Sequence, residues 1–124
     1  MFKKRIMLNL QHKNLKVWKR SISLVQAVYD VTKEFPAEEK FGLTNQMRRA
    51  SVSIPSNISE GAARKHMKDR LRFYEIARSS LVELDTQIEI ACELKYLKRK
   101  DRDEISELLN ANFALLSSML SHRA

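Results

Sequence analysis

Glycine and proline are scarce in this 124-residue chain, which contains only two of each. β-Rich folds need many turns, and these two residue types supply a large share of them. Their scarcity therefore argues against a β-rich fold and favours long helices joined by few loops. The length fits one domain and is enough to bury a modest core.

Cysteine occurs once, at Cys92, so an internal disulfide is excluded. Cys92 lies in the apolar-rich stretch IEIACEL, where we expect a small buried hydrophobe. A catalytic thiol would need an activating base, and no histidine is near it in the sequence.

The sequence also has few of the patterns that carry cofactors or metals. Two glycines cannot make a glycine-rich phosphate loop. His12, His66 and His122 do not pair with another histidine or with cysteine at metal-ligand spacing. We therefore expect no cofactor, no metal and no enzymatic activity. Because no apolar run could span a bilayer and no signal-peptide core is present, we expect a cytoplasmic protein.

Apolar residues recur at helical spacing in four segments, at about residues 15–34, 43–61, 68–96 and 101–121. Four amphipathic helices with short connections predict an all-α, antiparallel up-and-down four-helix bundle. We place this bundle at residues 14–122, after a basic tail at residues 1–13. Asn14 and Asp101 are the predicted N-caps of the first and last helices.

The second helix contains Pro55, and the apolar period continues on both sides of it. This continuity predicts one helix kinked at Pro55, because proline removes one backbone N–H. Nearby serine hydroxyls can hydrogen-bond locally and ease the defect. Gly61 serves either as a C-cap or to allow a close approach. Glu60, which follows the small-residue run, is a candidate buried partner for Arg48 or Arg49.

Two further expectations concern the core. The first helix carries an apolar stripe of Leu15, Trp18, Ile22, Val25 and Tyr29, and we interpret Trp18 and Tyr29 as packing residues. Asn112 falls on the apolar stripe of the last helix. A lone polar residue there can fix register or oligomeric state.

Positive charge is abundant and unevenly spread, with a net charge of +8. A strongly basic small domain suggests a polyanionic partner, most often nucleic acid. In an up-and-down bundle, the N-terminal region and the second loop lie at the same end. Cations from both segments would converge there and contact phosphates without reading sequence. The predicted nucleic-acid-binding residues are Lys13, Lys16, Lys19, Arg20, Arg64, Lys65, Lys68 and Arg72.

The 64–72 cluster has helical spacing of its own. Arg64, Lys68 and Arg72 would share one helix face if the third helix began early enough. Another basic cluster, at residues 98–102, lies at the opposite end of the predicted bundle.

Several motifs together resemble a known family. They are L-x-V-W at 15–18, F-P-x-E-E-x-F-G-L-T at 35–44, Q-x-R-R-A-x-V-S-I-P-S-N-I-x-E-G at 46–61, and R-F-Y-x-I-A at 72–77. Residues 15–97 resemble the four helix bundle protein family associated with intervening sequences in bacterial 23S rRNA genes. The signature positions carried over from that family are Arg48, Arg49, Pro55, Asn57, Glu60 and Gly61.

The resemblance implies a ring-like homopentamer without recognised catalytic residues. It extends more distantly to the accessory protein of diversity-generating retroelements, a basic bundle that binds a reverse transcriptase and nucleic acid. Two hypotheses follow. The first is a non-enzymatic homo-oligomer that binds nucleic acid, with structured RNA favoured over DNA. The second is a protein-binding scaffold or adaptor, with a reverse transcriptase as a possible partner.

Overall fold

The computed structural model describes residues 7–121, which contain four α-helices and no strand. The helices are α1 (Lys16–Thr32), α2 (Leu43–Ala62), α3 (Met67–Glu93) and α4 (Arg99–Ser121). Two short 3-10 helices, η1 (Gln11–Asn14) and η2 (Ala37–Glu39), precede α1 and α2. The predicted all-α four-helix bundle is confirmed.

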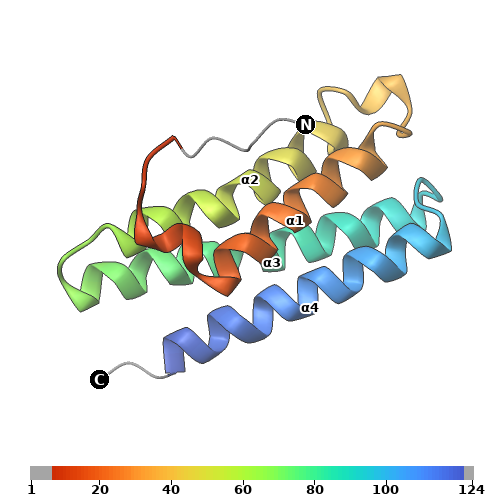
Figure 1. Cartoon of the computed structure of the whole chain (residues 1–124). Coiled ribbons are helices and arrows are strands. Elements are labelled where there is room, and N and C mark those ends of the chain that lie inside the picture. Colours follow the sequence, from red (N-terminus) through yellow and green to blue (C-terminus); the bar gives the residue numbers. More distant parts are fainter. Residues whose placement is uncertain (1–6, 122–124) are drawn as a thin grey trace, which may run out of the picture.

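The helices alternate in direction along the bundle (Figure 1). Contacts join α1 to α2, α2 to α3, α3 to α4 and α4 to α1, and α2 with α3 make the most extensive of them. The backbones of the diagonal pairs, α1 with α3 and α2 with α4, do not approach each other closely. The α1–α2 and α3–α4 loops therefore lie at one end. The α2–α3 loop and the start of α1 lie at the other (Figure 1).

The helix ends differ from the expected positions by a few residues. Asn14 belongs to η1, and α1 begins two residues later, so Asn14 is not its N-cap. Helix α4 begins at Arg99, which places Asp101 within its first turn rather than at its cap. After α3, Lys95 has a φ of 63°, a left-handed conformation that turns the chain toward α4.

The buried face of α1 is not the stripe that the sequence favoured. Val17, Leu24 and Val28 face the core, while Trp18 is only half-buried and packs beside it. Tyr29 lies at the surface with 37% of its area exposed, so its prediction as a core residue was wrong. The stripe of Trp18, Ile22, Val25 and Tyr29 follows the flank of α1 that faces α2.

Helix α2 runs without interruption through Pro55, which is buried. Side chains around the proline bond back to their own helix, as expected for this run. Ser59 Oγ donates to the carbonyl of Pro55 at 2.9 Å, and Asn57 Nδ2 donates to the carbonyl of Ser53 at 2.8 Å. The local polar groups are thus accommodated within one helix. The kink at Pro55 stays a prediction.

Gly61 lies inside α2 rather than at its cap, which is Ala63. A Cβ at Gly61 would lie 2.7 Å from Tyr74 Cε1 and 3.0 Å from the carbonyl oxygen of Arg70. Of its two predicted roles, close approach is the one that the structure supports. Only a residue without a side chain lets α3 come this near to α2.

Asn112 is fully buried, as its place on the apolar stripe predicted. Its Nδ2 donates to the carbonyl of Arg20 at 3.3 Å and to that of Leu108 at 2.8 Å, so it links α4 to α1. Cys92 is half-buried beside the core, and burial raises the pKa of its thiol. A thiol with a raised pKa stays protonated at neutral pH, in agreement with a packing role.

Candidate nucleic-acid interface

The first turn of α1 lies beside the end of α2. Trp18 Nε1 donates to Ser59 Oγ at 3.0 Å, which fixes the two helices against each other. The ring of His12 packs edge-on against Trp18 at 5.4 Å between centroids, so η1 folds onto the same end of the bundle. The cations of η1 and α1 therefore share this end with those of the α2–α3 loop (Figure 1).

Most of the predicted binding residues are free to meet a ligand. Seven of the eight have exposed side chains, and they are Lys16, Lys19, Arg20, Arg64, Lys65, Lys68 and Arg72. Lys13 is half-buried, and its Nζ donates to the carbonyl of Leu8 at 2.6 Å. Burial, and to a lesser degree the charge of Lys13, lowers the pKa of His12. The His12 ring is therefore predominantly neutral at pH 7 and adds little charge to this end.

The eight cations share one end, yet they do not form one continuous face. Helices α1 and α3 are diagonal in the bundle and their backbones do not come close, so Lys68 and Arg72 belong to a different corner from the α1 cations. The six residues before position 7, three of them basic, lie outside the described range. The described cations surround the end of the bundle, and we call these eight residues the end patch.

The predicted helix face shared by Arg64, Lys68 and Arg72 is wrong, because α3 begins only at Met67. Arg64 instead lies in the loop and forms an ion pair with Glu60 at 3.2 Å. Its guanidinium also lies over the ring of Phe73, 4.8 Å from the centroid. Part of its charge is therefore already balanced within the chain.

Two further outcomes concern this loop. Glu60 is exposed and pairs with Arg64, so its predicted pairing with Arg48 or Arg49 in a buried site is wrong. The i,i+4 spacing of Glu60 and Arg64 was visible in the sequence and could have indicated this pair. Arg70, a residue outside the predicted set, donates from Nε to the carbonyl of Arg64 at 2.7 Å and holds the loop.

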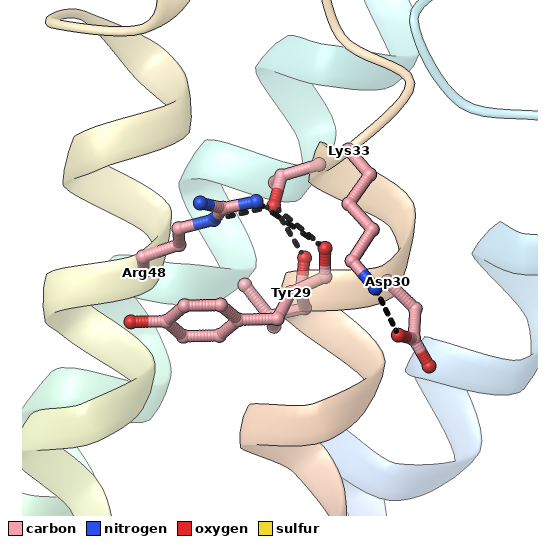
Figure 2. Close-up of polar contacts among 6 residues, drawn as sticks. Tyr29, Asp30, Lys33 and Arg48 are labelled. Atoms are coloured by element: carbon pink, nitrogen blue, oxygen red, sulfur yellow. Dashed lines mark hydrogen bonds and ion pairs between the residues drawn. The ribbon is translucent and has the colours of Figure 1, made fainter.

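Arg48 links α2 to α1 at the end of the bundle opposite the end patch. Figure 2 shows its side chain reaching from α2 to the last turn of α1. Its Nε donates to Thr32 Oγ1 at 2.9 Å and its Nη2 to the carbonyl of Tyr29 at 3.4 Å. Its guanidinium lies 4.5 Å from the centroid of the Tyr29 ring. A cation here adds a donor to one carbonyl in the last turn of α1 and interacts favourably with the helix dipole.

Beside Arg48, a shallow groove runs between α1 and α2. Its walls include apolar side chains of both helices, namely Trp18, Ile22, Val25, Tyr29, Val52 and Pro55. Its polar lining residues are Gln26, Asp30, Asn45, Ser53, Ser56 and Ser59. Arg48 and Arg49 line the same groove near Tyr29. Arg49 is exposed, and its side chain makes no hydrogen bond or ion pair with any residue in the described range. Sequence reasoning missed this α1–α2 groove because it assigned the α1 stripe to the core.

Among residues 7–121, no group of three or more His, Cys, Asp or Glu side chains could hold a metal ion. No helix there is long and apolar enough to cross a membrane.

The sequence of residues 13–118 matches the family model of the 23S rRNA-intervening sequence protein. The chain belongs to this family. The resemblance drawn from the motifs is thereby confirmed. The more distant similarity to the retroelement accessory protein stays a prediction. No curated protein matches the chain.

A solved structure has the same fold. It is the crystal structure of a protein with unknown function from the S23 ribosomal protein family of Bacteroides thetaiotaomicron. The two chains superpose with a TM-score of 0.76 at 20% identity, over 84% of this chain and 97% of the other. At this identity the likeness shows the shared fold alone.

Proposed function

We propose that this protein is a non-enzymatic, cytoplasmic homo-oligomer that binds structured RNA through the end patch. The observation that carries the proposal is the gathering of eight lysines and arginines at one end of a chain with net charge +8. Seven of these side chains are exposed. Contacts of this kind bind phosphates regardless of sequence, and their affinity falls steeply with salt.

The signature residues support a binding protein rather than an enzyme, because most of them have structural roles. Arg48 holds the end of α1, Gly61 lets α3 approach α2, and Pro55 is buried within α2. Asn57 donates to the backbone of its own helix, and Glu60 pairs with Arg64. Among these residues, only Arg49 has a side chain that makes no hydrogen bond or ion pair within the described range.

Oligomer formation is part of this proposal. The family resemblance implies a pentamer, in which several copies of a weak end patch would act together and raise the affinity by avidity. RNA is favoured over DNA because of the family's association with 23S rRNA intervening sequences, and rRNA is structured.

The test is the affinity for a structured rRNA hairpin, measured across a salt series. One variant carries Lys65→Glu, Lys68→Glu and Arg72→Glu. The matched control carries Lys98→Glu, Arg99→Glu and Lys100→Glu at the opposite end, so both lose six units of charge from the +8 of the wild type. Loss of about three phosphate contacts should flatten the slope of log affinity against log salt by about two to three.

The control variant distinguishes binding at the end patch from a general effect of the protein's net charge. We expect it to keep most of the wild-type affinity and slope. Equal losses in both variants would contradict the end patch as the binding site, and no binding of wild type at low salt would refute RNA binding. In the latter case the second function, a protein-binding scaffold such as a reverse transcriptase adaptor, is favoured by the exposed apolar residues of the α1–α2 groove.

A further inference from the structure

The end patch is divided between two corners of the bundle (Figure 1). Lys16, Lys19 and Arg20 lie in the first two turns of α1, and we call them the α1 corner. Lys68 and Arg72 lie in the first two turns of α3, and we call them the α3 corner. All five side chains are exposed, and their spacing of three or four residues puts the cations of each corner on one helix face.

Helix α2 ends between the two corners, because it packs against both α1 and α3. The charge at this end of α2 is balanced. Glu60, in its last turn, forms an ion pair with Arg64 at 3.2 Å, and the Arg64 guanidinium also lies over the ring of Phe73. The end of the bundle therefore presents a cationic corner, a balanced corner and a second cationic corner, in that order.

Both cationic corners stay positive when nearby acids are counted. The chain has no Asp or Glu before Asp30 or after Glu107, so neither the start of α1 nor the last turns of α4 carry an acid. Helix α3 has one acid in its first turn, Asp69. This acid is outnumbered by the three end-patch cations of the same stretch, Lys65, Lys68 and Arg72.

The aromatic rings at this end are already engaged within the chain. Trp18 is half-buried and donates from Nε1 to Ser59, and the ring of His12 packs edge-on against it. Phe73 is half-buried under the guanidinium of Arg64. Single-stranded bases bind mainly by stacking on open aromatic faces, whereas phosphates need only cations. The contacts that this end offers are therefore contacts to a phosphate backbone.

The separation of the two corners follows from the bundle. Neighbouring helix axes in such packing lie about 8–10 Å apart, so the axes of diagonal helices lie about 11–14 Å apart. The lysine and arginine side chains extend this span further. A double-stranded RNA stem has one phosphate strand along each side of its wide, shallow minor groove. Two cationic corners with a balanced end between them match two phosphate strands with a groove between them.

We propose that the end patch binds a double-stranded RNA stem across its minor groove, with the α1 corner on one phosphate strand and the α3 corner on the other. This inference rests on the proposed function and specifies the RNA that the end patch takes. A stem already holds its two strands at a fixed spacing. A single strand has one row of phosphates and must be ordered to reach both corners, which costs conformational entropy. Such binding depends on the shape of the RNA rather than on its base sequence.

The test compares a blunt-ended RNA duplex with an unstructured polyuridine strand that has the same number of phosphates. Fluorescence anisotropy measures both affinities across a salt series. One variant carries Lys16→Gln and Lys19→Gln in the α1 corner, and the other carries Lys68→Gln and Arg72→Gln in the α3 corner. The four side chains are exposed, and circular dichroism checks that each variant keeps its helix content.

The matched control carries Lys98→Gln and Lys100→Gln at the opposite end, which removes the same charge from exposed positions. We expect wild type and control to bind the duplex at least tenfold more tightly than the single strand. Each corner variant should lose most of this preference, because the single strand can use the corner that remains and the duplex loses one of its two contacts. For the duplex, each should also flatten the slope of log affinity against log salt by about two.

Two results would overturn this inference while leaving RNA binding intact. One is a wild type that binds both RNAs equally well. The other is a preference for the duplex that survives the loss of either corner, since contact from two corners would then not be its source. Binding to neither RNA at low salt would instead refute the proposed function, and this inference with it.

Discussion

Gly61 of α2 and Tyr74 of α3 come so close that a methyl group at Gly61 would lie 2.7 Å from Tyr74 Cε1. The backbone carbonyl of Arg70 lies on the same side at 3.0 Å, so the tyrosine ring cannot absorb the whole clash. The glycine therefore sets the distance between the two helices that share the most extensive contact.

Gly61→Ala should lower the free energy of unfolding by about 1–2 kcal/mol, even though alanine is the better helix former. Urea denaturation measures the change. Ser56→Ala is the control, because Ser56 is an exposed position of the same helix and the change adds no bulk toward α3. A Gly61→Ala variant as stable as the wild type would mean that α3 can move away without loss.

Arg48→Ala should lower the free energy of unfolding by about 1–2 kcal/mol, because the hydrogen bond to Thr32 and the contact with the Tyr29 ring are both lost. Arg49→Ala, at the next position, should change it by less than about 0.5 kcal/mol. The comparison is made on monomeric protein at low concentration, so that association does not contribute. Equal effects of the two substitutions would contradict the structural role of Arg48.

Asn112→Leu should raise the free energy of unfolding by about 1–2 kcal/mol. Within residues 7–121, no group donates to the buried Oδ1 of Asn112, and leucine removes this unpaired acceptor at similar volume. Asn112→Asp provides the contrast, since it loses both Nδ2 bonds and buries a carboxyl, and should be strongly destabilising. A leucine variant less stable than the wild type would show that the link from Asn112 to α1 outweighs its unpaired oxygen.

Tyr96 donates from its hydroxyl to Glu39 Oε2 at 2.9 Å and ties the α3–α4 loop to η2. This hydrogen bond, together with burial and the Glu39 charge, raises the pKa of Tyr96 above 10.0. The unfolded chain therefore releases the Tyr96 proton at lower pH than the folded protein does. The stability that the bond contributes is present below pH 10 and is lost as pH rises from there through the raised pKa.

The raised pKa of Tyr96 leads to a prediction for the Tyr96→Phe variant. The variant should have a lower free energy of unfolding than the wild type near neutral pH. This difference in free energy should shrink as pH rises past 10. Urea midpoints of both proteins between pH 7 and 11 measure it, and Glu39→Gln should weaken the same pH response. A difference that stays constant across this range would disprove the assignment to Tyr96.

The number and order of the helices could be predicted from the sequence because apolar residues recur at helical spacing in four segments. The helix ends were less certain, since capping side chains compete with other local solutions. Asp101 has the residue type of an N-cap, yet α4 begins at Arg99. Arg64 has the spacing of a helix-face residue, yet α3 begins after it and its side chain turns to Glu60 and Phe73.

The end patch could also be anticipated, because helix direction alone places the N-terminal region and the second loop together. The detailed shape of the end patch could not be predicted from the sequence. Only the packing order shows that α1 and α3 are diagonal and that their cations belong to different corners.

The sequence by itself determined the all-α class, the up-and-down order and the gathering of basic residues at one end. Tertiary structure decided which side of α1 is buried, because two neighbouring stripes share the same period. The buried stripe of α1 contains Ser21 and Thr32. Their hydroxyls donate to carbonyls of their own helix at 2.7 Å, so they can be buried at little cost. The other stripe, from Trp18 to Tyr29, forms a wall of the α1–α2 groove. Its position there depends on where α2 packs against α1.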